Sequence, residues 1–273
     1  MSVSNLSALV GVMTKAADRA SKSLLRDFGE VEHLQISRKG PADFVSEADR
    51  RAEEILYENL SQSRPGFSFY GEENGERAAL VTDGTQRAGR FIVDPLDGTT
   101  NFLHGLPHWC ISIAAEIDGQ IVAGVVYDPV KDELFAAEKG KGAWMGSKKL
   151  RASRRDSMAD CLFAVGLPFK GHGDVRSALR QAAVVTSQSS GLRRFGSAAL
   201  DLAYTAAGRY DGFWEAGLNA YDVAAGALIA SEAGCIVTDY AGSAEFIKNR
   251  QILAGGPMIY EKLLAEINQA VQQ

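Results

Sequence analysis

The sequence has little of what marks an exported, membrane-bound or disulfide-built protein. Its 3 cysteines among 273 residues lie far apart and form no CxxC pair, so we expect reduced thiols and no disulfide framework. No apolar run reaches the roughly 18 residues of a membrane-spanning helix, and no basic segment followed by an apolar core opens the chain. We therefore expect a cytoplasmic protein with no membrane partner.

The chain also lacks a strong excess of either charge. It carries 29 Lys and Arg against 34 Asp and Glu, a net charge of −5. Nucleic-acid binders normally present a basic face, so no nucleic-acid partner is expected. Hydrophobic residues make up 46% and charged residues 23% of the chain, which is typical of a globular protein. Because there is no repeat and no low-complexity linker, we predict a single domain over residues 1–273.

Periodicity predicts helices and short strands in the first half. Apolar residues from Leu6 to Phe28 recur at three- and four-residue steps, which predicts an amphipathic helix capped by Ser4 or Asn5. Alternating and turn-bounded segments predict strands and hairpins. The further elements expected are a helix at about 46–60, strands at 67–70 and 91–93, a polar loop at 75–90, and hairpins pairing 111–117 with 121–127 and 133–137 with 143–145.

Helices and strands alternate in the second half. The expected helices are 174–187, 197–207, 221–233 and 257–271, with Pro257 in the first turn of the last, and the expected strands are 161–165, 193–195, 211–215, 235–238 and 251–254. An antiparallel-rich half (about 1–150) followed by an alternating half (about 151–273) predicts an α/β fold of stacked helix and sheet layers.

The segment Asp-Pro-Leu-Asp-Gly-Thr at 94–99 is the main chemical signal. Pro95 excludes a regular helix interior, so we expect a turn after the 91–93 strand. Such a turn can aim Asp94, Asp97 and the carbonyl of Leu96 at one point, and an oxygen-only donor set suits Mg²⁺ better than Zn²⁺. The alternative is an Asx-type turn with solvated aspartates.

Further acidic residues stand at the ends of other predicted elements. Glu72 and Glu73 follow the 67–70 strand, and Glu215 follows another. Converging carboxylates repel one another strongly without cations, which favours a metal site over a purely structural role. Two structural alternatives remain: Asp222 as a helix cap or dipole partner, and Asp49 as the capping-box partner of Ser46.

Together these segments resemble the inositol monophosphatase family. The three signatures of that family are similar to Gly71-Glu72-Glu73, to the run from Asp94 to Phe102, and to Tyr221-Asp222-Val223-Ala224-Ala225-Gly226. The runs Asp43–Asp49, Gly196–Ala199 and Glu215–Leu218 follow the family's order, so the resemblance spans roughly residues 40 to 238. It implies an αβαβα sandwich and a homodimer.

The resemblance also implies a role for each residue. One Mg²⁺ would be held by Glu72, Asp94 and the Leu96 carbonyl, and a second by Asp94, Asp97 and Asp222. Glu72 would also touch a more weakly held third ion, so that two or three ions occupy each site. Thr99, oriented by Asp49, and Glu72 would position and deprotonate the attacking water. The backbone of Gly98 and Thr99 would meet the phosphate. Glu215, Asp222 and the backbone of Gly196, Ser197 and Ala198 would face the polyol.

The implied activity is Mg²⁺-dependent, Li⁺-sensitive hydrolysis of a small polyol or sugar phosphate, with myo-inositol 1-phosphate as the first expectation. Fructose-1,6-bisphosphatase, histidinol-phosphatase and 3′-phosphoadenosine phosphatase activities are alternatives, as is a non-catalytic regulatory protein on the same fold. Ala220-Tyr221 stands where most members have Pro-Trp. That departure leaves the implied metal ligands intact and bears on substrate choice.

Overall fold

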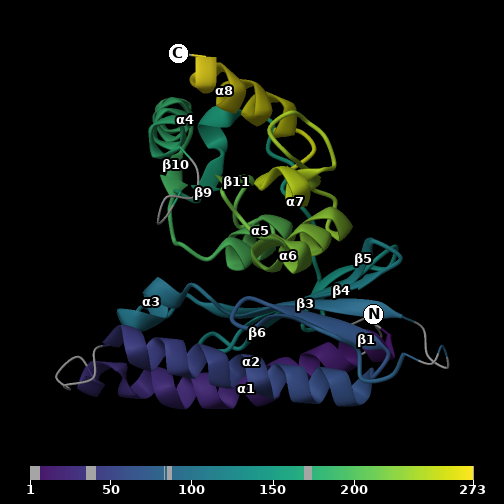
Figure 1. The fold of residues 1–273 in the computed structure, drawn as a ribbon. Helices are drawn as coiled ribbons and strands as arrows, with labels where there is room; N and C mark the ends of the chain where they lie inside the picture. Colours follow the sequence, from purple (N-terminus) through teal and green to yellow (C-terminus); the bar gives the residue numbers. More distant parts are fainter. Residues whose placement is uncertain (1–6, 35–40, 83, 85–87, 169–173, 273) are drawn as a thin grey trace.

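Helices and sheets alternate in five layers in the computed structural model, which describes residues 7–34, 41–82, 84, 88–168 and 174–272. Figure 1 shows a helix pair, a sheet, a second helix pair, a second sheet and two outer helices. The predicted αβαβα sandwich is therefore confirmed. In this part of the chain no helix is long and apolar enough to cross a membrane.

The first layer consists of α1 (Ala8–Leu34) and α2 (Pro41–Ser63). Apolar residues of both helices, such as Met13 and Leu56, are fully buried against one face of the first sheet. The helix predicted from about residue 46 starts five residues earlier, at a proline whose missing N–H costs nothing in a first turn. Ser46 thus lies inside α2, and the prediction of a capping box with Asp49 is wrong. The predicted caps Ser4 and Asn5 lie outside the described residues.

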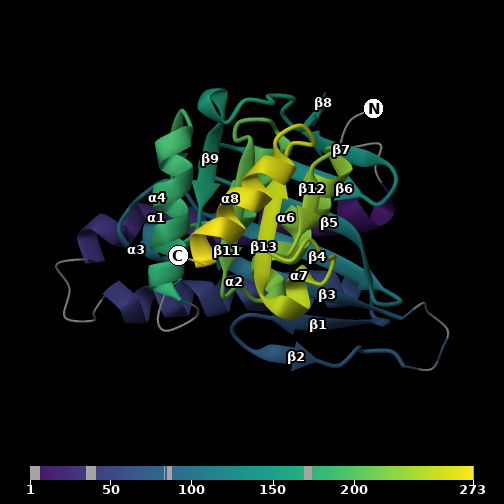
Figure 2. The same cartoon turned by 90° about the horizontal axis from the view of Figure 1, so that it is seen from above.

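The first sheet has eight strands in the order β2-β1-β3-β4-β5-β6-β7-β8. They are β1 (Phe67–Gly71), β2 (Gly75–Arg77), β3 (Gly89–Asp97), β4 (Cys110–Ile117), β5 (Gln120–Asp128), β6 (Glu133–Glu138), β7 (Gly142–Met145) and β8 (Lys148–Lys149). Only the β1–β3 pair is parallel. Both predicted hairpins are present. Figure 2 shows β1 and β2 along one side of the molecule, where β2 occupies part of the segment expected to be a loop.

The middle layer consists of α5 (Ala198–Ala206) and α6 (Ala220–Glu232), both covered by sheets on their two sides. Their many alanines let the backbones come close. At Gly124 on β5, an added Cβ would lie 2.8 Å from the carbonyl oxygen of Ala225 on α6. Glycine is therefore needed at 124 for α6 to pack this near the first sheet.

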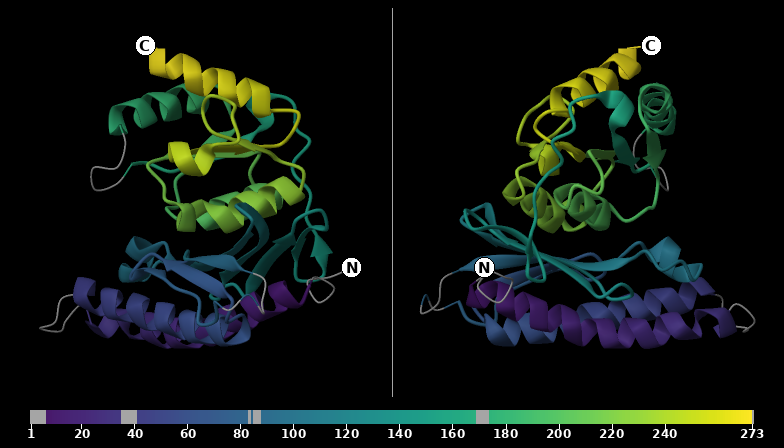
Figure 3. Two further views of the ribbon diagram at one scale, coloured as in Figure 1. Left: turned by 45° about the vertical axis from the view of Figure 1, so that its right-hand side comes forward. Right: turned by 180° about the vertical axis from the view of Figure 1, so that it is seen from behind.

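The second sheet and the outer helices complete the sandwich, and Figure 3 shows the layers from two further directions. The strands lie in the order β10-β9-β11-β13-β12. Their bounds are β9 (Leu162–Val165), β10 (Gly191–Arg193), β11 (Gly212–Ala216), β12 (Ile236–Thr238) and β13 (Gln251–Gly255). The remaining helices are α3 (Thr99–Leu103), α4 (Val175–Gln188), α7 (Phe246–Asn249), α8 (Tyr260–Gln272) and the 3-10 turn Met158–Asp160. Two predictions need shifting: β10 lies two residues before 193–195, and Pro257 precedes α8 instead of opening it.

Candidate active site

The two aspartates of the 94–99 segment lie on an irregular end of β3. Asp94 pairs with Ser112 on β4 and Asp97 with Cys110, so three steps along β3 face two along β4. This is a β-bulge, which re-aims the side chains around it. The prediction of a turn after a strand ending at residue 93 is thus wrong, because β3 continues through Asp97. Within the bulge, the Leu96 N–H donates to Asp94 Oδ1 at 3.0 Å.

Gly98 turns the chain from β3 into α3. Its φ is 94°, in the left-handed region that favours glycine. An added Cβ would also lie 2.9 Å from the carbonyl oxygen of His108. Thr99 begins α3, and its hydroxyl donates to the Leu96 carbonyl oxygen at 3.0 Å. The glycine therefore fixes where Thr99 stands relative to the two aspartates.

Glu72 reaches the same place from the neighbouring strand. Gly71, the last residue of β1, pairs in parallel with Val93, so Glu72 and Asp94 follow side by side. Their carboxyl groups lie within hydrogen-bond reach of each other. Two carboxyl groups this close need a shared proton or a cation between them.

Asp97 connects this end of the first sheet to the start of α5. Asp97 Oδ2 accepts from the Ser197 hydroxyl and from the Ala199 backbone N–H, both at 2.7 Å. The Cys110 thiol points to the same oxygen at 3.8 Å. The structure thus joins the predicted metal ligand Asp97 to the predicted polyol-binding segment 196–198.

The third group of predicted residues comes from β11 and α6. Glu215 lies near the end of β11, beside Gly166, where any side chain on the glycine would overlap the Glu215 carboxyl group. Asp222 lies in the first turn of α6 and accepts from the Asn219 N–H at 2.6 Å, while the Asn219 side chain accepts from the helix. Asp222 is therefore a capping-box residue, as one alternative predicted, and its second oxygen is not engaged by that bond.

Tyr221 occupies the position where this chain departs from the family pattern. Its hydroxyl accepts from Asn219 Nδ2 at 2.7 Å, and its ring lies 5.8 Å from that of Tyr70. The Ser112 hydroxyl donates to its backbone carbonyl oxygen at 3.3 Å. Tyr221 therefore fastens the start of α6 to β1 and β4 beside the carboxylates.

Burial raises the pKa of every one of these carboxyl groups, and repulsion by neighbouring acids adds to it for Asp94, Glu72, Glu215 and Asp222. Burial, then Glu72 and Asp97, hold the pKa of Asp94 well above its ordinary value. Burial chiefly raises the pKa of Asp97, against its hydrogen bonds to Ser197 and the α5 backbone. For Asp222 burial raises the pKa to about 7, and for Glu215 to about 8, where the charges of Asp97 and Asp222 add to it. The pKa of Glu72 is also raised.

Asp49 lies close to this group on α2 without touching Thr99. It is 3% exposed, and its Oδ1 has no hydrogen-bond partner. Burial and the charge of Glu72 raise its pKa to about 9. The hydrogen bonds of the described residues include none between Asp49 and Thr99, whose hydroxyl is turned to Leu96. The predicted orientation of Thr99 by Asp49 is therefore not formed in this arrangement.

The donor chemistry fits Mg²⁺, although no ready-made cage is present. In the part of the chain that the structure describes, no three His, Cys, Asp or Glu side chains already surround one point. The carboxyls of Glu72 and Asp94 nevertheless face each other, and Asp49 has an orphaned buried oxygen. Oxygen donors of this kind are those that Mg²⁺ prefers. Small side-chain shifts would let cations replace the protons that this cluster otherwise needs.

The sequence assigns no role to two residues near the site, although one of them, Asn101, lies within the 94–102 signature. Asn101, 8% exposed, donates through Nδ2 to the carbonyl oxygens of His108 (2.8 Å) and Phe195 (2.7 Å), joining α3 to the segment before α5. Glu53 on α2, 0% exposed, accepts three hydrogen bonds from the residues after Glu72. An asparagine in the 94–102 signature could have drawn attention to the first. Nothing local distinguishes Glu53 from Glu54.

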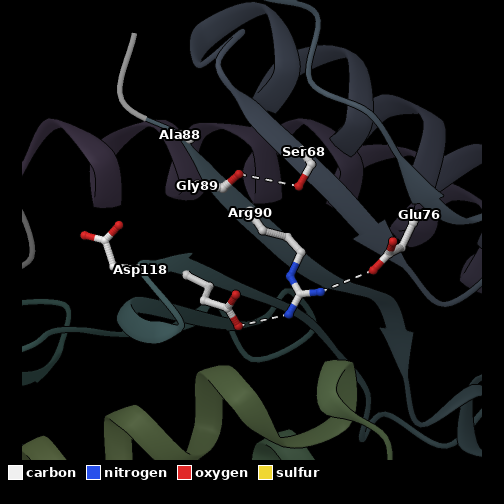
Figure 4. A pocket seen from close by; sticks show the side chains of 7 residues that line it. Ser68, Glu76, Ala88, Gly89, Arg90 and Asp118 are labelled. Carbon is white, nitrogen blue, oxygen red and sulfur yellow. Dashed lines mark hydrogen bonds and ion pairs between the residues drawn. The ribbon is translucent and has the colours of Figure 1, made fainter. Parts of the chain in front are cut away.

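A cavity of about 410 Å³ lies elsewhere, lined by Ser68, Glu76, Ala88, Gly89, Arg90, Glu116 and Asp118 (Figure 4). Arg90 spans it, with guanidinium nitrogens 3.2 Å from Glu76 and 3.0 Å from Glu116. Because β1 and β3 start at this cavity and end at Gly71 and Asp97, the cavity and the carboxylates are at opposite ends of the two strands.

Fold and site together define an αβαβα sandwich with a cluster of buried carboxyl groups, and comparison with known proteins gives the family. Residues 5–273 match the inositol monophosphatase family. The chain therefore belongs to this family, and it is a phosphatase by class. The resemblance inferred from the three signatures is confirmed.

Three relatives show how closely the chain resembles known members. The inositol-1-monophosphatase of Mesorhizobium japonicum is 50% identical over 261 residues, or 96% of each chain. A protein of Escherichia coli K12 named Nus factor SuhB is 37% identical over 95% of each chain. The crystal structure of the extragenic suppressor protein suhB from Bartonella henselae superposes with a TM-score of 0.87 at 49% identity, covering 96% of this chain and 99% of that one.

Proposed function

We propose that this protein hydrolyses a phosphomonoester of a small polyol, with myo-inositol 1-phosphate as the foremost substrate and Mg²⁺ as the activating ion. The observation that carries the proposal is the gathering of Glu72, Asp94, Asp97 and Asp222 where the ends of β1 and β3 meet the starts of α5 and α6. The name of the Mesorhizobium relative supports the substrate.

On this proposal two ions would be held by oxygen atoms of Glu72, Asp94, Leu96 (its carbonyl), Asp97 and Asp222. A third ion would be touched by Glu72. Bound Mg²⁺ supplies positive charge that polarises a phosphoryl group and acidifies water. The carboxylates would then be ionised, because cations offset the repulsion that raises each pKa.

The other residues would act directly on water, phosphate and polyol. Thr99 would donate to Asp49 instead of to Leu96, giving the orphaned oxygen of Asp49 a partner, and with Glu72 would orient and deprotonate the attacking water. The backbone N–H groups of Gly98 and Thr99 would receive the phosphate. The polyol would contact Asp222, Glu215 and the backbone of Gly196, Ser197 and Ala198.

Phosphate release tests this proposal. The substrates are inositol 1-phosphate, fructose 1,6-bisphosphate, histidinol phosphate and 3′-phosphoadenosine 5′-phosphate, each with Mg²⁺, without it, and with added Li⁺. We expect Mg²⁺-dependent, Li⁺-inhibited release, fastest from inositol 1-phosphate. Faster phosphate release from another substrate would support the proposed metal chemistry and would replace inositol 1-phosphate as the proposed substrate. Release that does not depend on added or bound metal would overturn the mechanism.

A regulatory role on the same fold is the second candidate, and the relative named Nus factor SuhB favours it. A binding role alone does not require so many raised carboxyl pKa values in one place. Absence of turnover with all four substrates, combined with demonstrable metal binding, would favour this candidate.

We also propose that the protein forms a homodimer. Leu106 and Phe195 are 53% and 41% exposed, and both are bonded to Asn101: the Leu106 N–H donates to its backbone carbonyl oxygen, and its Nδ2 donates to the Phe195 carbonyl oxygen. A self-associating surface would bury these apolar residues. Light scattering should give twice the 29.3 kDa chain mass, and a monomer at all concentrations would refute the proposal.

A further inference from the structure

We propose that Glu53, a residue outside all three signatures, is a positioning residue for the carboxylate of Glu72. It would hold the turn after β1 so that Glu72 stays beside Asp94. This inference rests on the proposed function, because it assigns Glu72 to metal binding.

Three hydrogen bonds tie Glu53 to this turn. Its Oε2 accepts from the Glu73 N–H at 2.8 Å, and its Oε1 accepts from the Asn74 N–H at 3.0 Å and from Asn74 Nδ2 at 2.7 Å. Both carboxylate oxygens are thus used on the two residues that directly follow Glu72. A displacement of this turn would carry Glu72 with it.

The approach of Glu53 depends on the glycine before Glu72. A Cβ added to Gly71 would overlap the Glu53 carboxyl group. Gly71 is also the last residue of β1 paired to β3, opposite Val93. Glu72 is therefore held from two directions, by the sheet on one side and by Glu53 on the other.

An ion pair compensates the charge of Glu53 only weakly. In the described part of the chain its partner is Arg77, at 4.0 Å, and Arg77 makes its closer contact, 2.8 Å, with Glu54. A buried carboxylate is costly unless hydrogen bonds satisfy it. Here backbone and amide N–H groups satisfy the Glu53 carboxylate, and all three belong to Glu73 and Asn74. We therefore assign to the side chain the role of holding the 72–74 turn in place.

Binding of Mn²⁺, a spectroscopic stand-in for Mg²⁺, measured by electron paramagnetic resonance without substrate, tests the proposal. The variant is Glu53→Gln, which keeps the shape but turns one acceptor oxygen into an NH₂ donor that faces N–H groups. We expect about 10-fold weaker Mn²⁺ binding, since residues that orient metal ligands typically contribute about 10–100-fold. Glu53→Asp, which keeps the charge but not the reach, should weaken it as well.

The matched control is Glu54→Gln, the same change one residue along α2 at a side chain that is 48% exposed. It should bind Mn²⁺ like the wild type. Thermal melting provides a second readout: a merely structural role would lower the melting temperature equally with and without Mn²⁺, whereas a positioning role also shrinks the increase that Mn²⁺ produces.

The outcomes separate this inference from the proposed function. A wild-type protein that binds no Mn²⁺ would refute the proposed function. A wild type that binds and a folded Glu53→Gln that binds equally well would refute the role of Glu53 alone. If Glu53→Gln does not fold, Asn74→Ala removes one of the three bonds at an exposed position, and its unchanged Mn²⁺ affinity would overturn the inference.

Discussion

The two sides of the site are built in different ways. The carboxylate side (Glu72, Asp94 and Asp97) comes from strand ends of the first sheet, where two of its three acids are at least nine-tenths buried. The loop side (Ser197, Ala198 and Glu215) comes from the second half of the chain and is satisfied mainly by hydrogen bonds and close packing. The first side brings like charges together within itself, whereas Glu215 on the second side is repelled by acids that lie outside that side, Asp97 and Asp222.

This difference indicates which part of the activity each side controls. Repelling acids gain from a cation, so changes there should alter metal binding and rate. The loop side offers directional contacts to hydroxyl groups, so changes there should alter substrate affinity and choice. The departure at Tyr221 lies beside the carboxylates, in contact with β1 and β4, and replaces no predicted metal ligand.

The largest effect is expected from Asp94→Asn on the carboxylate side. Asp94 is the acid assigned to both ions, so kcat/KM should fall at least about 10²-fold, the upper range for residues that only support ligands. Because the change removes a repelling charge, the metal-free protein should melt no earlier than the wild type. Phosphate release and melting with and without Mg²⁺ check this. The control is Asp18→Asn on the exposed face of α1, and near-normal turnover at saturating Mg²⁺ would contradict the assignment.

A smaller and different effect is expected from Glu215→Gln on the loop side. Loss of a charged hydrogen bond of about 1.5–3 kcal/mol should raise KM for inositol 1-phosphate by about 10-fold or more. Turnover of p-nitrophenyl phosphate, which has no polyol hydroxyls, should stay close to normal. An equal loss of kcat on both substrates would place Glu215 in the chemical step and erase the distinction between the sides.

Asn101→Ala tests whether the two sides act separately, because Asn101 lies on α3 just after Asp97 and donates to the Phe195 carbonyl oxygen just before Ser197. Two carbonyl oxygens would lose their donor, which should lower the unfolding free energy by about 1–3 kcal/mol and raise KM a few-fold. Urea unfolding and kinetics measure the two effects. The control is Asn268→Ala, which removes one hydrogen bond from a side-chain amide on α8 to the Tyr240 carbonyl oxygen. It should lower stability without changing KM. Unchanged KM in Asn101→Ala would show that the sides are already fixed independently.

The smallest effect concerns the pH dependence of stability at His108. The centroid of its ring lies 4.8 Å from that of Phe195. Burial, with the charge of Lys131, lowers the pKa of His108 to about 4. A base with a lowered folded pKa contributes stability above its unfolded pKa of about 6.5, and that contribution is lost as pH falls through about 4. Between pH 7 and 4 the free energy of unfolding should therefore fall more steeply with decreasing pH for the wild type than for His108→Gln. Parallel profiles would contradict this.

Local patterns predicted most elements and the motif residues, and failed where distant segments decide. The hairpin at 111–127 and the helix containing Asp222 follow from turn residues and periodicity close to them. The bulge between Asp94 and Asp97 depends on pairing with β4, and α2 extends through Asp43-Phe44-Val45, a run that looks extended by propensity. Tertiary packing overrides such weak local preferences.

The contacts of the site were harder still to predict. The motif predicts Asp97 as a metal ligand, but its bonds to Ser197 and Ala199 join residues about 100 positions apart, which no spacing rule encodes. Glu53 and Glu54 are identical neighbours in sequence, and only the three-dimensional position of the 72–74 turn separates a buried anchor from an exposed acid.

The hydrogen bond from Ala199 to Asp97 cannot form until both residues have been synthesised. The two residues are 102 positions apart, so at about 5–20 residues per second a ribosome makes Asp97 about 5–20 s before its partner. During that interval the Asp97 carboxylate is without the hydrogen bonds that Ser197 and Ala199 later donate to it. Glu215 and Asp222 are made later still, so the site cannot be complete before the start of α6 has been synthesised.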